Sequence, residues 1–527
     1  MKLYASDIIL FLLFFLMVVG VSMYKSRKEE TGEDFFLASR GLLWPFIGLS
    51  LIAANISTEH FVGMAGQGAG SAGMAIASYE WMAAICMVLV CLFFLPRFLR
   101  AGIYTMPEYL EYRYNSAARS LMAFYTMLIY VFVTISAVIY SGALALNTIF
   151  GIKLIYAVWM IGGIAALYTT WGGLKAVAWA DLFQGSALIL GGAITMILGF
   201  FAVGGVATFF EYNANKLHMI LPADHPVLPW TALVIGLWIP NFYYWGLNQY
   251  ITQRTLAAKT LRQGQIGVIF AAGLKLIIPF IIIFPGIMAY QLYGDQLTAA
   301  GATTDSAYPL LIRNLIPTGL RGFIFAAIAG AVISSLASML NSASSIFTMD
   351  LYKQHINKQA AGQSLVTMGR MTTVIFVIIG CLIAPNLRHP SLQGIFTYIQ
   401  EFQGFISPGI LAAFVFGFIF PKAPPMAGVT ALILNPIVYG LLLIFFGKLP
   451  LFNELGLTIG RIAFLNRMAI TFIIIIGAMA LLSYFRPLPA PRILPVRQGF
   501  DMQATPVVKW LGTAVIALTL ILYVIFW

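Results

Sequence analysis

The stretch SLIAANISTEHFVGMAGQGAGSAGMAIASYEW, residues 50–81, decides the fold. It has the apolar character of a membrane segment, but Asn, Ser, Thr, Glu and His side chains and five glycines interrupt it. Backbone groups inside a bilayer must be satisfied, so an interrupted helix persists there only where protein or a watery cavity surrounds it. We therefore expect half of a solute and ion site, with a re-entrant loop or an extramembrane turn as the alternative. Glu80 strengthens this reading, because an ionisable residue inside a membrane is costly and is usually functional.

The composition excludes a soluble globular protein. Of the 527 residues 61% are hydrophobic and 9% are charged, and the mean hydropathy is +0.91. The apolar runs are roughly 20 residues long, the length of a membrane-spanning helix and not of a barrel strand. We therefore expect an all-α polytopic membrane protein. The net charge of +12 then indicates topology and not nucleic-acid binding.

The cysteines and the N-terminal run carry no special chemistry. Cys86, Cys91 and Cys381 lie in apolar runs without CxxC spacing, so the pattern favours packing residues over disulfides or a zinc site. The first run, residues 7–24, has no small-residue cleavage site before Lys25. We expect a retained helix and not a signal peptide.

Apolar runs bounded by charges, Pro or Gly predict about fourteen transmembrane helices. The expected spans are residues 7–24, 43–66, 72–96, 120–148, 153–171, 181–203, 229–250, 265–291, 322–348, 365–385, 394–420, 425–446, 460–484 and 507–526. Loops that hold most of the Lys and Arg residues face the cytoplasm if both termini lie outside. Two such loops are residues 97–119 and 252–265, and we assign them no chemistry beyond solvated charge.

A second interruption predicts a repeat. The seventh span contains WIPNFYYWGLNQY, where Pro240 removes a backbone donor and should break the helix. Broken helices at matching places in two halves of five spans predict a 5+5 inverted-repeat core with a transport site between the halves. The chain is then one transmembrane domain, divided into a peripheral first helix and loop (1–42), a first repeat (43–203), a second repeat (229–420) and three peripheral helices (421–527).

One face of the ninth span is polar. Serines and an asparagine recur there at helical spacing, at Ser334, Ser338, Asn341, Ser342 and Ser345. Small residues of this kind also promote close helix packing, which is the structural alternative. Beside a broken helix, however, the hydroxyls of Ser334 and Ser335 and free carbonyls suit a hard cation that prefers oxygen ligands. Sodium is the natural candidate.

Several further polar side chains lie at membrane depth. Lys275 is too far from either end of its span to reach the interface easily, so we expect it to face the bundle interior, where a structural ion pair is the alternative. Others that could face a polyhydroxylated ligand are Asn55, His60, Glu80, Asn241 and Gln400. This mixture of donors and acceptors fits a neutral sugar or polyol better than an anion. Aromatic faces for a ring or a gate are offered by Tyr79, Tyr243, Tyr244 and Trp245, although such residues also serve as packing or interface anchors.

Other classes of protein fit poorly. The sequence has no P-loop, and its histidines lack HExxH or another metal spacing, so we expect no enzyme and no ATP-driven pump. A channel remains a competitor, but the polar residues come singly from many spans instead of repeating one filter sequence.

At these residues the chain resembles the sodium/solute symporter family, especially its bacterial sodium/galactose and animal sodium/glucose members. The resemblance covers nearly the whole chain. The motifs that carry it, in the family's order, are SLIAANISTEHFVGM, AIASYEWM, GGLKAVAWADLFQ, NFYYWGLNQYITQRTLAAK, FAAGLKLIIPF, ISSLASMLNSASSIFTMDLYK and YIQEFQGFISPGI.

The resemblance implies specific site residues. It implies a sodium site formed by the carbonyls of Ala53, Ile56 and Ala331 and the hydroxyls of Ser334 and Ser335. It implies a sugar site with Asn55, His60, Tyr79, Glu80, Asn241, Lys275 and Gln400, with Tyr244 closing the inner side and Trp245 beside it. Asp181 matches a family carboxylate near the ion path, and Ser338 joins it as a candidate for a second ion.

Three departures from the family pattern bear on specificity. His60 stands where galactose-type bacterial members have Gln, and Ala83 replaces a Ser near the sugar. Ala337 offers no hydroxyl where two-sodium members place one, so we expect one sodium ion per sugar.

The expected function is sodium-coupled symport of a neutral sugar, galactose or glucose, by alternating access. The alternatives are another solute, such as inositol, an amino acid or a sugar acid, and outside the family a channel or a membrane substrate sensor. We expect a multi-pass protein of the cell (inner) membrane whose partners are the sugar, sodium and the lipid bilayer, without nucleic acid. The sequence leaves the oligomeric state open.

Overall fold

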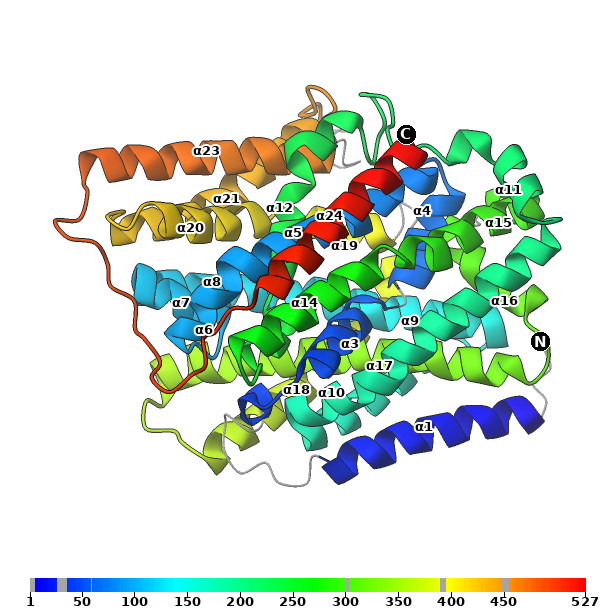
Figure 1. The fold of residues 1–527 in the computed structure, drawn as a ribbon, viewed down its shortest axis with the longest axis horizontal. Helices are drawn as coiled ribbons and strands as arrows, with labels where there is room; N and C mark the ends of the chain where they lie inside the picture. Colours follow the sequence, from blue (N-terminus) through cyan, green and yellow to red (C-terminus); the bar gives the residue numbers. More distant parts are fainter. Residues whose placement is uncertain (1–4, 26–35, 58, 300–302, 389–394, 448–454) are drawn as a thin grey trace.

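The computed structural model describes residues 5–25, 36–57, 59–299, 303–388, 395–447 and 455–527 (Figure 1). Within these ranges every regular element is helical, apart from one isolated parallel bridge between Leu42 and Ala258. The expected all-α fold is therefore confirmed.

The elements up to residue 216 include the first broken helix. In chain order they are α1 (Ala5–Lys25), η1 (Ala38–Arg40), α3 (Trp44–Asn55), η2 (Glu59–Met64), α4 (Ala65–Ala69), η3 (Gly73–Ala77), α5 (Ser78–Leu89), η4 (Val90–Phe94), α6 (Leu95–Ala101), α7 (Met106–Arg113), α8 (Ser116–Ile129), η5 (Tyr130–Ile135), α9 (Ser136–Phe150), α10 (Leu154–Ala202), α11 (Val206–Tyr212) and η6 (Ala214–Lys216). The η segments are 3-10 or π turns that mostly continue a neighbouring α-helix.

The elements after residue 216 include the second broken helix. They are η7 (Ala232–Gly236), α12 (Trp238–Gly246), α13 (Gln249–Leu256), α14 (Leu261–Lys275), α15 (Ile278–Thr298), η8 (Thr304–Ser306), α16 (Ala307–Leu315), α17 (Leu320–Ile346), η9 (Phe347–Ile356), α18 (Gln363–Ile383), η10 (Ala384–Arg388), α19 (Ile395–Gln403), α20 (Ser407–Ile419), α21 (Pro425–Phe446), α23 (Phe464–Phe485) and α24 (Pro506–Ile525).

Many of these helices are long and apolar enough to cross a membrane. In the part of the chain that the structure describes, ten segments meet this criterion, and the pair α19 and α20, bent by 45°, makes an eleventh. The second and seventh expected spans are built from shorter helical pieces. The multi-pass membrane architecture is confirmed, whereas the exact count of fourteen stays a prediction.

Two expected boundaries differ from the structure. The fifth and sixth spans, expected as separate helices, belong to the continuous helix α10. The segment between them contains Gly172 and Gly173 but no proline, and glycine alone weakens a helix by only about 1 kcal/mol. The second difference concerns Pro240, which lies in the first turn of α12, where its missing donor costs no helical hydrogen bond. The break itself comes later, at Leu247 and Asn248.

The loops expected to carry only solvated charge are partly buried. Arg113 donates from Nε to the carbonyl of Gly417 at 2.9 Å and from Nη2 to that of Phe420 at 2.5 Å, so it caps the end of α20. Arg119 donates to Asp350 at 2.7 Å. These arginines therefore stabilise the fold besides marking its topology.

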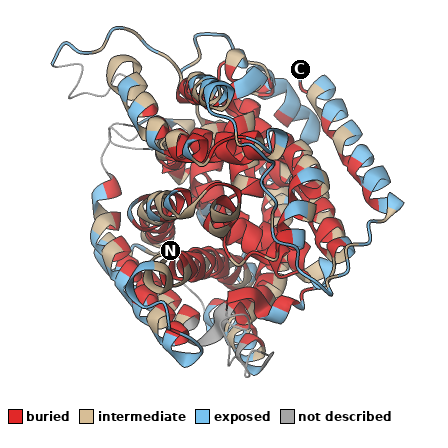
Figure 2. Ribbon diagram, turned by 90° about the vertical axis from the view of Figure 1, so that its left-hand side faces the viewer, coloured by how far each residue is buried: buried red, intermediate tan, exposed pale blue. Residues whose placement is uncertain are grey.

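The polar helix α17 lies at the centre of the bundle. In the most apolar part of the span that contains α17, 89% of the residues are buried, whereas in the span formed by α1 only 17% are buried. Figure 2 shows the same contrast, with buried residues in the middle and exposed residues on the outer helices. α1 packs against α10 and α17 at one edge, and α23 lies at the opposite edge in Figure 1. The expected polar face of α17 is therefore directed into protein.

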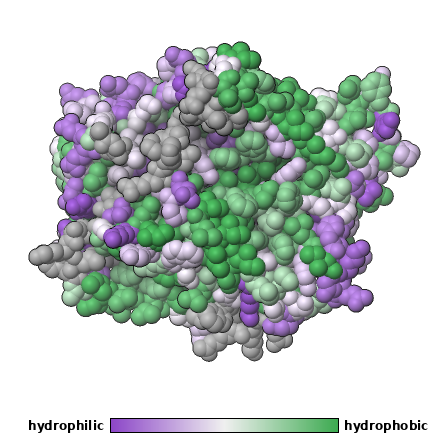
Figure 3. Space-filling view, turned by 180° about the vertical axis from the view of Figure 1, so that it is seen from behind, coloured by the Kyte–Doolittle hydropathy of each residue, from purple (hydrophilic) through white to green (hydrophobic). Residues whose placement is uncertain are grey.

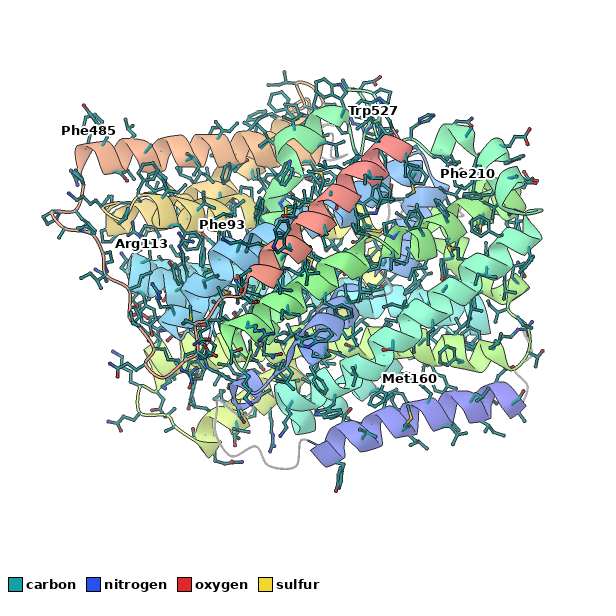
Figure 4. All side chains as sticks on the ribbon, viewed as in Figure 1. Phe93, Arg113, Met160, Phe210, Phe485 and Trp527 are labelled. Carbon is teal, nitrogen blue, oxygen red and sulfur yellow. The ribbon has the colours of Figure 1, made fainter. Side chains whose placement is uncertain are left out.

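The surface has the character of a membrane protein. Apolar side chains gather across the middle of the face seen in Figure 3, and hydrophilic ones lie toward its left and right ends. Large apolar side chains on the outside of the helices include Phe93, Met160, Phe210 and Phe485 (Figure 4). α1 begins and α24 ends toward the same side of Figure 1, which agrees with an even number of crossings.

Candidate functional site

The first broken helix opens between α3 and η2. α3 ends at Asn55, and Ile56 adopts an extended conformation with φ −76° and ψ 99°. The hydroxyl of Ser57 then accepts a hydrogen bond from the backbone N–H of Glu59 at 3.2 Å, as a capping serine does. Carbonyls at the C-terminal end of a helix are the ones that the helix itself does not pair, and the predicted ligand Ala53 lies in this last turn of α3.

The second broken helix opens between α12 and α13. The carbonyl of Tyr243 accepts from the backbone N–H groups of both Leu247 and Asn248 at 2.9 Å, which closes α12. Asn248 starts α13 from an extended conformation, and its side-chain oxygen accepts the hydroxyl proton of Tyr130. A polar side chain from another helix thus fixes this break, and both expected broken helices are confirmed.

The two breaks face one cavity. Eight of the nine side chains predicted to bind substrate line it: Asn55, His60, Tyr79, Glu80, Asn241, Tyr244, Trp245 and Gln400. They come from the first broken helix, α5, α12 and α19. Residues from both halves of the chain therefore converge on one space, as the predicted site between two repeats requires.

The ninth predicted residue, Lys275, lies behind the cavity wall. Its ammonium donates to a carboxylate oxygen of Glu80 at 2.5 Å and to the side-chain oxygen of Asn55. It also lies 4.8 Å from the centre of the Trp245 ring, a cation–π contact. Lys275 is fully buried at the C-terminal end of α14. The ammonium therefore holds two cavity residues in place.

His60 and Tyr79 have unused polar atoms. His60 Nε2 lies 3.5 Å from the second carboxylate oxygen of Glu80. Within the described residues, no protein group pairs with His60 Nδ1 or with the hydroxyl of Tyr79, although both atoms are buried. Buried polar atoms without partners are uncommon in folded proteins, so both are suited to a ligand's hydroxyl groups.

Tyr244 joins the two broken helices. Its hydroxyl accepts from the side-chain amide of Asn55 at 2.9 Å and from the hydroxyl of Tyr250 at 2.6 Å. Its ring meets that of Trp245 edge-on at 5.2 Å. The bond to Asn55 must break if the two helices separate, which fits the predicted gate. Asn241 donates to the carbonyl of Leu237 at 3.0 Å and lines the cavity.

The predicted sodium ligands lie where α17 passes the end of α3. Ser335 donates to the carbonyl of Ala54 at 3.3 Å, which brings α17 against the break. Ser334 donates to a carboxylate oxygen of Asp181, so its own oxygen lone pairs remain free for a cation. All five predicted ligands, Ala53, Ile56, Ala331, Ser334 and Ser335, are fully buried.

The candidate second-ion residues have a cationic partner. Asp181 and Ser338 both contact Arg254, at 3.0 Å and 2.5 Å from Nη2. Arg254 falls in the loop 252–265 that the charge pattern assigned to solvent, yet it is fully buried on α13. That expectation is wrong, because the helix after the break extends to Leu256 and carries the arginine inward.

Other cavity residues were missed by the sequence analysis. Glu59 lines the cavity beside His60, and Thr134, Tyr250 and Gln403 add further polar side chains to its wall. Glu59 was visible in the sequence, since it is a second acidic residue in the interrupted stretch. The other three give no signal, because hydroxyl and amide residues are common on packed membrane helices.

Comparisons with known proteins agree with this arrangement. A model of the sodium:solute symporter family matches residues 35–434. The sodium/glucose cotransporter of Vibrio parahaemolyticus is 44% identical over 79% of this chain and 81% of its own length. The uncharacterized symporter YidK of Escherichia coli is 34% identical over 95% of this chain and 88% of its own length. The sodium/myo-inositol cotransporter 2 of Bos taurus is 33% identical over 82% of this chain and 68% of its own length.

Solved structures share the fold. A Na+-coupled sialic acid symporter in a substrate-bound, outward-open state superposes with a TM-score of 0.80 at 23% identity, over 94% of this chain and all of the other. Mhp1, a nucleobase-cation-symport-1 family transporter, has a TM-score of 0.54 at 14% identity. The superposition covers 86% of this chain and 96% of Mhp1. At these identities the likeness concerns architecture alone.

Proposed function

The chain belongs to the sodium:solute symporter family, and from this premise we propose that it carries a neutral sugar, galactose or glucose, by alternating access. Sodium is the co-transported ion, as the family implies. The observation that carries the proposal is the cavity, where amide, hydroxyl, imidazole and carboxylate groups surround a space beside aromatic rings. Such a mixed set suits a ring of hydroxyl groups.

The charges around the cavity argue against an anionic solute. The ammonium of Lys275 is engaged by Glu80 at 2.5 Å, so it is not free to pair with a sugar acid. Glu59 adds a second carboxylate to the same wall. A carboxylate-bearing solute would therefore meet like charge in a desolvated space, which is unfavourable.

Sodium supplies the driving free energy. With a neutral solute each sodium ion moves one charge, worth roughly 2.3 kcal/mol at about 100 mV. A tenfold sodium gradient adds roughly 1.4 kcal/mol. One ion then supports accumulation of the sugar by several hundred-fold.

The test is uptake of labelled galactose into proteoliposomes that hold the purified protein. Uptake should require an inward sodium gradient, saturate with galactose, and stop when choline replaces sodium. Unlabelled glucose should compete, and a sugar acid should not. Competition by a sugar acid alone would exclude a neutral substrate, and uptake that never saturates would indicate a channel.

A cyclitol is the second candidate substrate. It carries the same kind of hydroxyl ring, and a relative 33% identical to this chain is named a sodium/myo-inositol cotransporter. Unlabelled myo-inositol in the same competition assay decides between them: a lower half-inhibitory concentration than that of galactose would assign the cyclitol.

We also propose the orientation with both termini outside the cell membrane. Its support is the positive charge of the loops assigned to the cytoplasm. A reporter that is active only in the cytoplasm, fused after Trp527, should be inactive.

A further inference from the structure

The helix α19 forms one wall of the cavity. Its residues that line the cavity are Phe396, Ile399, Gln400 and Gln403. α19 has only nine residues and is bent by 45° from α20, which follows it. A helix of this length is not stable by itself, so contacts from other elements must hold it in place. The directions of Gln400 and Gln403 therefore depend on the elements to which α19 is attached.

Asn435 of α21 bridges the bend between α19 and α20. Its amide nitrogen donates to the carbonyl of Gly404 at 3.2 Å, and its oxygen accepts from the backbone N–H of Gly409 at 2.8 Å. Tyr439, one turn later on α21, packs against the same bend, since a Cβ atom at Gly404 would collide with its ring. α21 therefore fixes the place of the bend.

An ion pair holds α19 itself. The carboxylate of Glu401 accepts a hydrogen bond from the hydroxyl of Tyr439 at 2.9 Å and another from Nη2 of Arg467, on α23, at 2.8 Å. Arg467 is 3% exposed, and within the described residues its Nε and Nη1 have no hydrogen-bond partner. Separation of the pair would leave a buried charge uncompensated, which is strongly unfavourable. The pair therefore resists movement of Glu401 away from α23.

Glu401 passes this restraint on to the cavity. It directly follows Gln400, and successive residues of an α-helix lie roughly 100° apart around the helix axis. Because Glu401 is fixed toward α23, Gln400 is fixed toward the cavity. In the described part of the chain Arg467 does not line the cavity. It also lies beyond residue 434, where the match to the family model ends.

We propose that Arg467 is a positioning residue for solute binding, which acts through Glu401 to hold α19 in the orientation that presents Gln400 to the solute. The inference rests on the proposed function and extends the solute site to α23, a helix that the sequence analysis expected to be peripheral. Loss of the ion pair should weaken solute binding and leave the sodium site, at α3 and α17, unchanged.

The test measures uptake of labelled galactose into proteoliposomes at saturating sodium. Arg467→Gln should raise the half-saturating galactose concentration about tenfold, as loss of a hydrogen bond to a charged group does, with little change in the maximal rate or in the sodium dependence. Arg467→Lys keeps the charge and should recover most of the affinity. Arg486→Gln, a change at the exposed end of the same helix, should behave as wild type.

Three outcomes of this assay overturn the proposal. The first is a wild-type half-saturating concentration in Arg467→Gln. The second is a loss of affinity that Arg467→Lys does not recover. The third concerns Glu401→Gln, which should bring no further loss when combined with Arg467→Gln, because both variants break the same contact; additive losses would mean that Arg467 does not act through Glu401.

A second measurement needs no solute. Gln400→Cys places a thiol on the cavity face of α19, and the three natural cysteines are buried. Its rate of modification by a small, water-soluble methanethiosulfonate reagent should rise severalfold when Arg467→Gln is added, because a wall without its tie opens more often, and should stay unchanged when Arg486→Gln is added. An unchanged rate with Arg467→Gln overturns the proposal. If wild type takes up no galactose, the proposed function fails, while this rate still decides whether Arg467 holds α19.

Discussion

The ammonium of Lys275 lies 2.5 Å from a carboxylate oxygen of Glu80, and both residues are buried. Lys275 lies on α14 and Glu80 on α5, and the two residues are 195 positions apart along the chain. Because Lys275 also binds Asn55, its ammonium links Glu80 on α5 to Asn55 on α3. The shape of the cavity therefore depends on a charge that need not touch the solute.

Removal of either charge should weaken sugar binding. We expect Lys275→Met and Glu80→Gln each to raise the half-inhibitory galactose concentration by about 10- to 150-fold, since a hydrogen bond to a charged group contributes about 1.5 to 3 kcal/mol. The double variant should lose less than the sum of the two, because it leaves no unpaired buried charge. Competition binding in detergent measures all three.

Arg321→Gln is a matched control for this cycle, because Arg321 is only partly buried near the start of α17 and bonds a local carbonyl. Additive effects of the two cavity variants would mean that Lys275 and Glu80 act independently and that the pair does not shape the site.

The hydroxyl of Ser335 should matter for sodium more than for folding. Ser335→Ala removes an oxygen beside the carbonyls of the α3 break but keeps a small residue that suits close helix packing. We expect the sodium concentration for half-maximal uptake to rise about tenfold, with nearly unchanged expression and unfolding temperature. Sodium activation of uptake measures it.

Ser344→Ala provides the comparison for that variant. Ser344 is an equally buried serine on α17, and it bonds the carbonyl of Asn341 three residues earlier. The Ser344→Ala variant should leave the sodium dependence of uptake unchanged. Equal sodium activation in both alanine variants would remove Ser335 from the ion site.

Much of this site follows from the sequence because its residues break a rule of membrane helices. Lys275, His60 and Glu80 are ionisable at membrane depth, and such residues must face the interior. The serines of α17 share one face at helical spacing, so their common direction is predictable as well. In the structure His60 and Glu80 line one cavity, Lys275 lies behind its wall, and Ser335 contacts the first break.

Arg254 shows where this reasoning fails. It lies near other basic residues at the end of a span, a pattern typical of cytoplasmic loops. Its burial depends on how far α13 continues after the break and on the presence of a carboxylate, Asp181 on α10, that pairs with the guanidinium. Both depend on tertiary packing, which the local pattern does not contain.

Glu59 is the cavity carboxylate that the sequence analysis passed over, and it should contribute to sugar binding. Glu59→Gln keeps the size of the side chain but removes a charged acceptor, so we expect galactose affinity to fall about tenfold or more. Sodium binding without sugar should be unchanged. Competition binding and the sodium dependence of the unfolding temperature separate the two effects.

An acidic residue on the exposed helix α11 supplies the control for Glu59. Glu211 is exposed to solvent, so Glu211→Gln should behave as wild type. Wild-type galactose affinity in Glu59→Gln would show that this carboxylate lines the cavity without contacting the solute.

Asp305 should make stability depend on pH. It lies in η8, outside the membrane-spanning segments, where one carboxylate oxygen accepts the backbone N–H of Ile395 at 3.3 Å and the other abuts Gly66 of α4. Burial raises the pKa of the Asp305 carboxyl from 3.8 to about 6. The folded state therefore holds this proton more tightly than the unfolded state, and the Asp305 contribution to stability falls as pH rises from about 4 to about 6.

Asp305→Asn keeps an acceptor for Ile395 and removes the charge. Its unfolding temperature should match that of wild type near pH 4 and exceed it above pH 6, by a difference that corresponds to at most roughly 3 kcal/mol. Asp295→Asn, a change at an exposed position of α15, should show no such pH-dependent gain. A constant difference between Asp305→Asn and wild type from pH 4 to pH 7 would mean that the carboxyl is not protonated in the folded protein, and that water reaches it between α4 and α19.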